Sequence, residues 1–292
     1  MKTRIITSVV AIAVFVPFCI FSKEPWFLFV IFCEIVALLG TYEMLKCIGL
    51  HKSVFISVIS YPAVFACVLM TRLVATCGEY FLGVSFICFT LIFLSVSAST
   101  FSKGRISVKD AAVGAVMTIY ISFSASCILL LRDMELFGAP EQINVGAYLY
   151  LLVFVFAWLP DIGGYFVGMA FGKHKLIPDV SPKKTVEGFF GGIIFSLVAS
   201  VVYSFVIGFR SDDIAGFFVF ALLSIVCAVV SVFGDLIFSL IKRQYGIKDY
   251  GFIFPGHGGI LDRFDSVLAV APFFYMLSYC LNHAGLFADF AG

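Results

Sequence analysis

The densest polar run in the chain lies between Ser239 and Asp265 and is flanked by two long apolar segments. Aspartates are interspersed in it with lysines and arginines, whereas an ordinary cytoplasmic loop needs only the basic residues. Carboxylates suit Mg²⁺, and ammonium and guanidinium groups bind phosphates. The run, with Asp235 just before it, therefore predicts a site for a polyphosphate and its cation. The charged candidates are Asp235, Lys242, Arg243, Lys248, Asp249, Asp262, Arg263 and Asp265.

The spacing of these residues suits helices. Asp235, Ser239 and Lys242 are four and three positions apart, so they share one face of a helix. Asp235 lies inside an apolar run, where a carboxylate must be paired or bound to a metal. Asp262 and Asp265 are three apart and would share a face if a helix begins near them.

A glycine-rich stretch, 255–259, supplies backbone N–H groups with no bulky side chains between them. The backbone of Gly256, Gly258 and Gly259 is suited to approach phosphates closely. His257 lies within this stretch and is a candidate functional residue. The alternative is a neutral imidazole in a turn.

A second polar segment, 172–187, contains Ser181, Lys183 and Lys184. These residues could hold phosphate groups, although lysines are also expected here from membrane topology alone. Taken by itself, this segment predicts no particular ligand.

Two further carboxylates fall in apolar stretches. Asp161 precedes Gly164 and Gly168, whose spacing of four favours close helix packing over catalysis. This applies to the glycines, whereas a functional role of Asp161 stays open because an acidic residue in an apolar stretch is costly. Glu34 lies in the middle of an apolar segment, where an acidic residue is costly and is either functional or paired with a neighbouring helix. We interpret Glu34 as structural, because no motif surrounds it.

Composition places these residues in a membrane protein. Of the 292 residues, 62% are hydrophobic and 13% are charged, against about 45–50% and about 25% in soluble domains. The net charge of +1 gives no argument for nucleic acid binding. The nine cysteines include no C-x-x-C pair, so zinc and redox motifs are absent from the sequence.

Hydropathy predicts an all-α, polytopic membrane bundle of about nine transmembrane helices, each needing about 20 apolar residues. The first is interpreted as a retained helix, because no small-x-small cleavage site follows it. The predicted spans are 5–22, 26–45, 54–77, 80–98, 110–131, 145–171, 187–209, 214–241 and 266–284.

The distribution of basic residues predicts a cytoplasmic N-terminus. With that orientation, only Lys23, Arg72, Arg132 and Arg210 lie in outside segments, and every other lysine and arginine lies inside. Loops 172–187 and 242–265 then face the cytoplasm. We expect the helices within residues 1–150 to anchor the protein and to give access to lipid. Residues 151–292 are expected to form a catalytic transmembrane domain.

The run from Ser239 to Asp265 resembles the signature of the phosphatidate cytidylyltransferase family. The shared elements are Ser239 with Lys242-Arg243, Lys248-Asp249, and His257-Gly258-Gly259 followed by Asp262-Arg263 and Asp265. Upstream, Ser181-Pro182-Lys183-Lys184-Thr185 is also similar, and the resemblance is specific over about 160–266. One departure is Ile162, which stands where the family usually carries a hydroxyl residue after Asp161.

The resemblance implies transfer of a cytidylyl group from CTP to phosphatidate in the cell (inner) membrane, with a cytoplasmic active site. It implies Mg²⁺, as one of two cations of which the other could be monovalent, and a homodimer. Metal ligands are expected to be Asp235, Asp262 and Asp265. Catalytic residues are expected to be Asp235, Lys242, His257, Asp262 and Arg263. Substrate-binding residues are expected to be Ser181, Lys183, Lys184, Ser239, Arg243, Lys248, Asp249, Gly258 and Gly259.

Several other classes of protein compete with this interpretation. A membrane kinase that uses CTP to phosphorylate a polyprenol or phytol would share the cations and acidic residues. The D-G-x-x-A-R string of CDP-alcohol phosphotransferases is absent. A transporter is disfavoured because no internal repeat is found, and a structural scaffold would not need so many aspartates beside cations.

Overall fold

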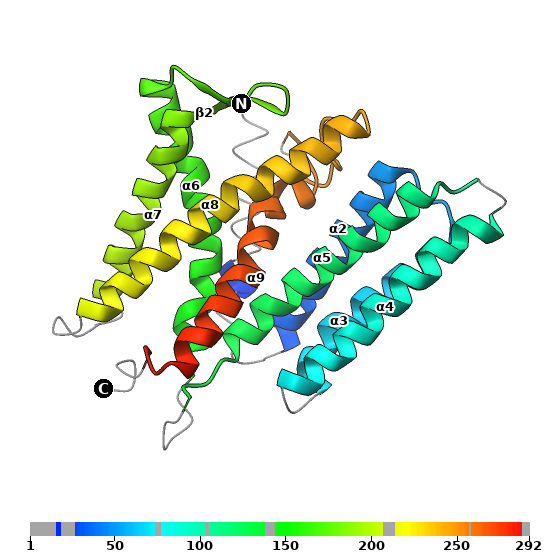
Figure 1. Cartoon of the computed structure of the whole chain (residues 1–292), viewed down its shortest axis with the longest axis horizontal. Coiled ribbons are helices and arrows are strands. Elements are labelled where there is room, and N and C mark those ends of the chain that lie inside the picture. The colour runs from blue at the N-terminus through cyan, green and yellow to red at the C-terminus, as the bar shows by residue number, and fades with distance from the viewer. Residues whose placement is uncertain are drawn as a thin grey trace. The chain divides into compact units, whose positions relative to one another are not determined.

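The computed structural model describes residues 16–18, 27–73, 77–102, 105–137, 144–206, 214–256 and 258–287. In this part of the chain, eight helices are long and apolar enough to cross a membrane (Figure 1). The all-α polytopic membrane fold and eight of the nine predicted spans are therefore confirmed. The remaining span, 5–22, lies almost entirely outside the described residues, and the cytoplasmic N-terminus stays a prediction.

Connecting segments of different lengths join the helices, and one of them contains a small sheet. The strands pair antiparallel inside the segment 172–187, where the sequence predicted only a loop. The helices are α2 (Phe27–Ile48), α3 (Val54–Leu73), α4 (Cys77–Phe101), α5 (Val108–Arg132), α6 (Gly146–Phe171), α7 (Val186–Val206), α8 (Ile214–Gln244) and α9 (Leu261–His283). The strands are β1 (Lys175–Ile177) and β2 (Ser181–Thr185).

The chain forms two compact units. The first comprises residues 1–129 and 244–264, and the second comprises residues 130–243 and 265–292. Each unit is described by itself below. The expected roles of residues 1–150 and 151–292 stay a prediction.

In the first unit, α2 packs against α3, and α3 packs against α4. Helix α4 carries exposed apolar side chains at spacings of three and four residues, namely Leu82, Phe86, Phe89 and Phe93. This spacing places them along one side of the helix. An apolar surface of this kind is stable against lipid and costly in water.

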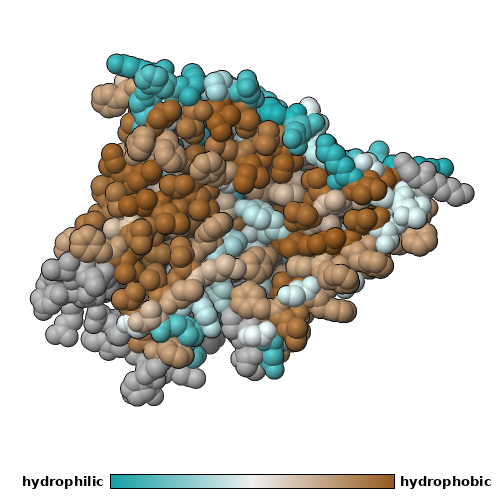
Figure 2. Space-filling view, in the orientation of Figure 1, coloured by the Kyte–Doolittle hydropathy of each residue, from teal (hydrophilic) through white to brown (hydrophobic). Residues whose placement is uncertain are grey.

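In the second unit, α6 and α7 pack closely where their glycines meet. A Cβ atom on Gly164 would lie 3.2 Å from the carbonyl oxygen of Gly188, and one on Gly192 would lie 2.6 Å from that of Pro160. The predicted packing role of the glycines in α6 is therefore confirmed. Figure 2 shows a hydrophobic surface over α7 and α8 that becomes hydrophilic at the end where β2 lies.

The last helix begins earlier than the sequence predicted. Hydropathy placed its start at residue 266, because Asp262, Arg263 and Asp265 lower the apolar average, but α9 begins at Leu261. Helix α8 likewise runs to Gln244 and not to 241. The earlier start is favourable because the Glu43 carboxylate accepts the N–H groups of Ile260 and Leu261 at this helix start. The connection between the two helices is therefore shorter than the predicted loop 242–265.

Candidate active site

The sheet fixes the position of Lys184 in the second unit. Strand β2 ends at Thr185, whose Oγ1 accepts the N–H of Gly188 at 3.1 Å and so caps the start of α7. The Glu187 carboxylate accepts the backbone N–H of His174 at 3.2 Å and contacts its Nδ1 at 2.7 Å. These bonds tie both ends of the hairpin to α7, which leaves Lys184 on a well-anchored strand.

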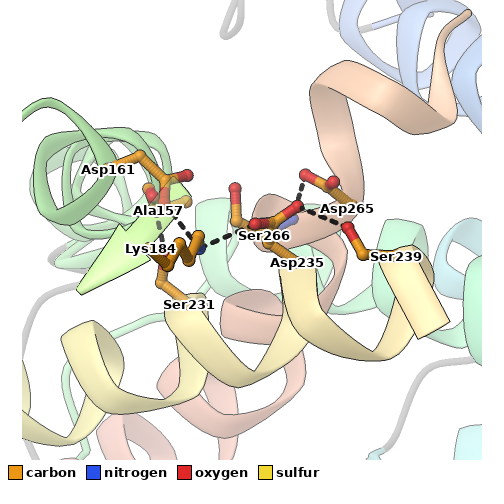
Figure 3. Close-up of polar contacts among 8 residues, drawn as sticks. All are labelled: Ala157, Asp161, Lys184, Ser231, Asp235, Ser239, Asp265 and Ser266. Carbon is orange, nitrogen blue, oxygen red and sulfur yellow. Dashed lines mark hydrogen bonds and ion pairs between the residues drawn. The ribbon is translucent and has the colours of Figure 1, made fainter. Parts of the chain in front are cut away.

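Lys184 bridges two carboxylates that come from different helices. Its Nζ lies 2.7 Å from Oδ2 of Asp235 in α8 and 3.2 Å from Oδ1 of Asp161 in α6 (Figure 3). Burial favours the neutral amine, but the two carboxylates outweigh burial and raise the pKa of Lys184 above its ordinary value of 10.5. The ammonium is therefore charged at neutral pH.

Asp235 also contacts a second acidic residue. Its carboxyl group is hydrogen-bonded to that of Asp265 in α9, and Ser239 Oγ donates to Asp235 Oδ1 at 3.4 Å (Figure 3). Asp265 is 7% exposed and accepts the N–H of Ser266 at 2.7 Å. The structure confirms that Asp235 and Ser239 share a helix face and that Asp235 is paired. Two carboxylates in contact repel unless a proton or a cation lies between them.

Small residues bring α8 close enough to its neighbours for these contacts. Ser231 Oγ donates to the carbonyl oxygen of Ala157 in α6 at 2.7 Å (Figure 3). A Cβ atom on Gly234 would overlap with the Cβ of Ala269 in α9. The positions next to Asp235 therefore hold three helices at short distance, as small residues do between membrane helices.

A cavity of about 270 Å³ opens beside Lys184. Its lining includes Ser181 and Lys183 from the hairpin, Asp161 and Tyr165 from α6, and Lys184 itself. The structure thus brings together the three residues predicted to bind phosphate from segment 172–187. In the structure the Lys184 ammonium contacts carboxylates, so its contact with phosphate stays a prediction.

In the first unit, Asp262 organises the glycine-rich stretch. Its Oδ2 accepts the N–H of Tyr250 at 2.8 Å and that of Gly259 at 2.9 Å. Gly256 and Gly258 have φ angles of +79° and +88°, which side-chain-bearing residues rarely adopt. The stretch is therefore a tight turn, and the N–H of Gly259 is directed at Asp262 within the chain.

Comparison with known proteins settles the family of this chain. The model of the cytidylyltransferase family matches residues 2–281. The chain belongs to the cytidylyltransferase family. It is 32% identical over 280 residues to a phosphatidate cytidylyltransferase of Staphylococcus haemolyticus. The matched region covers 95% of this chain and 98% of the relative. The proteins of the same name from Bacillus subtilis and Staphylococcus aureus are each 32% identical, and cover 95% of this chain and 97% and 98% of their own lengths.

The remaining site residues predicted for this cytidylyltransferase-family chain are spread over both units. Lys242 is 9% exposed and acts electrostatically on Asp235. His257 lies outside the described residues. The exposed candidates are Arg243, Lys248, Asp249 and Arg263. The roles of all of these in binding or catalysis stay predictions.

Two structural features of this family member could not be found from local sequence. Asp161 joins the acidic cluster through Lys184, while the neighbouring Ile162 is 47% exposed. Glu43 in α2 accepts the backbone N–H groups of Ile260 and Leu261, which lie 217 and 218 positions away. No sequence pattern signals a hydrogen bond at such a separation, so Glu43 is not among the residues that the sequence predicts for the site.

Proposed function

We propose that the chain is a phosphatidate cytidylyltransferase, which transfers the cytidylyl group of CTP to phosphatidate and releases CDP-diacylglycerol and pyrophosphate for phospholipid biosynthesis. Membership of the family and the names of its relatives support this function. The structural observation that carries it is the cluster of Asp161, Lys184, Asp235 and Asp265. Four separate elements converge there beside a cavity with further cationic lining.

The reaction asks the protein mainly for position and charge. A phosphate oxygen of phosphatidate bonds to the α-phosphorus of CTP, and the bond from that phosphorus to the pyrophosphate oxygen breaks. Both substrates are anionic, so catalysis depends on holding them in line and neutralising the charge that develops. Lys183, Lys242, Arg243, Lys248 and Arg263 are the cations that we assign to this task.

The acidic pair fits a divalent cation. Asp235 and Asp265 present two hard oxygen ligands in direct contact, and Mg²⁺ is often held by one or two carboxylates while substrate phosphates and water complete its shell. Within the described ranges, no group of three or more His, Cys, Asp or Glu side chains could hold a metal. When bound, the cation would neutralise charge on the phosphate oxygens.

We assign Asp262 as a further metal ligand, and leave open whether a second cation is divalent or monovalent. One Asp262 oxygen accepts two backbone N–H groups, so a cation would be held by its other oxygen. Lys184 keeps Asp235 and Asp161 apart and oriented. Ser181 and Ser239, with the glycines of the turn, would contact the substrates, and His257 would bind phosphate or transfer a proton.

The cytoplasmic face of the cell membrane is the proposed place of the reaction. The hairpin end of the second unit is hydrophilic, whereas the surface along α7 and α8 is hydrophobic (Figure 2). Such a surface keeps the site at the level of lipid headgroups, where phosphatidate presents its phosphate. CTP reaches the same level from the cytoplasm. A homodimer stays a prediction that the family resemblance alone supports.

The proposal is tested by lipid product formation. Protein purified in detergent is incubated with phosphatidate and radiolabelled CTP, with and without Mg²⁺, as wild type and as Asp235→Asn and Asp262→Asn. We expect metal-dependent CDP-diacylglycerol from the wild type, and a rate lower by about 10³-fold in both variants, because each loses a charged ligand.

Asp179→Asn is the matched control, because Asp179 is exposed in the turn of the same hairpin that carries Lys184. It should keep the wild-type rate. No product from folded wild type would overturn the proposed function and favour a CTP-dependent lipid kinase. Product that persists in Asp235→Asn or Asp262→Asn would keep the reaction and remove the corresponding ligand.

A further inference from the structure

A buried carboxylate in α2 holds the start of the helix that carries Asp262. Glu43 is 2% exposed. Its Oε1 accepts the N–H of Ile260 at 3.0 Å, and its Oε2 accepts the N–H of Leu261 at 2.9 Å. All three residues belong to the first unit. Each carboxylate oxygen therefore has a backbone donor, and both donors are adjacent in the chain.

The two donors lie where a helix most needs an acceptor. Helix α9 begins at Leu261, and the first N–H groups of a helix have no acceptor within it. A carboxylate at this position satisfies them and interacts favourably with the positive end of the helix dipole. Glu43 therefore acts as an N-terminal cap of α9, although it belongs to a different helix, α2.

Glycines on both sides of the turn make room for this carboxylate. A Cβ atom on either Gly251 or Gly259 would overlap with Oε1 of Glu43. On α2 itself, a Cβ on Gly40 would lie 3.1 Å from the Leu261 side chain. The backbone of 251–261 is therefore fitted around Glu43, which supports a specific role of this side chain over general packing.

Glu43 and Asp262 together account for three successive N–H groups of the turn. Gly259 donates to Asp262, whereas Ile260 and Leu261 donate to Glu43. A change in Glu43 would shift the first turn of α9, and Asp262 lies in that turn. An error of about 1 Å in the position of a reacting group can lower a rate by about 10²-fold.

We propose that Glu43 is a positioning residue for cytidylyl transfer: it fixes the first turn of α9 and the glycine-rich turn before it, and so sets where Asp262 and Arg263 are presented to the substrates. This inference rests on the proposed function, because it assigns Glu43 to the same reaction. Glu43 itself contacts backbone N–H groups and is not assigned to the substrates.

The test compares Glu43→Gln, Glu43→Asp and Glu43→Ala with the wild type. In Glu43→Gln one acceptor oxygen becomes an NH₂ group that faces a backbone donor, so we expect kcat to fall by about 10- to 100-fold while the KM for CTP stays within about threefold. Glu43→Ala should be at least as impaired, and Glu43→Asp, which keeps the charge, should recover part of the loss.

Glu34→Gln is the matched control. Glu34 is also an acidic residue of α2, and its Oε1 is buried without a hydrogen-bond partner among the described residues. The same chemical change there should leave kcat within about twofold of the wild type, because no backbone N–H group in the described part of the chain donates to its Oε1.

Hydrogen exchange supplies a readout that does not depend on activity. In Glu43→Gln we expect faster exchange in peptides that cover 250–262, with α3 and α4 unchanged. Wild-type kcat together with wild-type exchange in this segment would overturn the inference. Faster exchange throughout the first unit would also overturn it, since Glu43 would then be a general stabilising residue. Failure of the proposed function would look different, because wild type and Glu34→Gln would both make no CDP-diacylglycerol.

Discussion

The two units hold their important carboxylates in different ways. In the second unit, Asp235 and Asp161 are bonded to the side chain of Lys184, and Asp235 also contacts Asp265. In the first unit, Glu43 and Asp262 accept backbone N–H groups. A side-chain partner can move aside for a cation or a phosphate, whereas a backbone partner cannot move without moving the chain. The side-chain contacts of the second unit therefore suit exchange with ligands, and the backbone contacts of the first unit suit positioning.

The largest expected effect is at the pair of carboxylates in contact. In Asp265→Asn the amide can donate to Asp235 without a shared proton, whereas the two carboxyl groups of the wild type are hydrogen-bonded only while a proton lies between them. We expect the thermal unfolding temperature without divalent cation to stay the same or rise, while kcat falls about 10³-fold, equivalent to about 4 kcal/mol. Asp179→Asn, on the exposed turn of the hairpin, serves as control. A rate within threefold of wild type would remove Asp265 from the site.

Removal of the bridging ammonium should chiefly affect stability. Lys184→Met leaves Asp161 and Asp235 without the cation that bridges them, and because these side chains are only partly buried we expect a cost of about 1.5–3 kcal/mol. Unfolding in detergent measures this cost, and Asp161→Asn added to Lys184→Met should recover part of it. Lys183→Met, the exposed neighbour, should change stability by less than about 0.5 kcal/mol. Equal stabilities of the two lysine variants would contradict the bridge.

The difference in unfolding free energy between wild type and Lys184→Met depends on pH, because the pKa of Lys184 is raised in the folded protein. A group whose folded pKa is raised contributes stability below its unfolded pKa, about 10.4 for lysine, and loses it as the pH rises through the folded pKa. The stability gap between wild type and Lys184→Met should be constant from pH 7 to about pH 10 and should shrink above that. A gap that closes below pH 9 would show that the carboxylates do not hold the charge.

A smaller effect is expected where the backbone is fitted around Glu43. Gly251→Ala introduces a Cβ atom that overlaps with the Glu43 carboxylate, and overpacking of this kind costs about 1–3 kcal/mol. Addition of Glu43→Asp, with a side chain shorter by one methylene, should relieve part of the clash, so the double variant should be more stable than additivity allows. Strict additivity in unfolding measurements would show that the two positions do not interact.

The smallest effect on activity is expected at a hydrogen bond that contributes only to stability. The Tyr245 hydroxyl donates to Asp110 Oδ1 at 2.8 Å. Burial and, to a smaller extent, the Asp110 carboxylate raise the pKa of Tyr245 to about 12. Tyr245→Phe should lower the free energy of unfolding by about 1 kcal/mol and leave kcat unchanged. A loss of kcat above tenfold would place this contact in the positioning network beside Glu43.

Sequence alone predicted the parts of the fold that depend on local hydropathy. The spans near α5 and α6 are correct to within two residues, because long apolar runs end at charged residues. The predicted start of α9 is wrong by five residues, because Asp262 and Asp265 lower the mean hydropathy at the beginning of the helix. The acceptor that makes an earlier start favourable, Glu43, comes from another part of the chain. The hairpin in 172–187 was also missed, since its strands are three and five residues long.

The site was predicted in the same uneven way. Helical spacing correctly joined Asp235 to Ser239, because both lie on one helix. The bridge from Lys184 to Asp161 and Asp235 joins three elements, and no spacing rule connects a strand to two helices. Family resemblance predicts which residues form the site, whereas only the structure shows that Lys184 is bonded to carboxylates.

The central claim is that the chain forms a bond between the α-phosphorus of CTP and a lipid phosphate. The most direct measurement gives the purified protein phosphatidate with CTP radiolabelled either at the α- or at the γ-phosphate, and follows where each label goes. Cytidylyl transfer predicts the α label in the lipid product and the γ label in pyrophosphate. A γ label found in the lipid, with the α label left in a soluble nucleotide, would contradict it and show phosphate transfer.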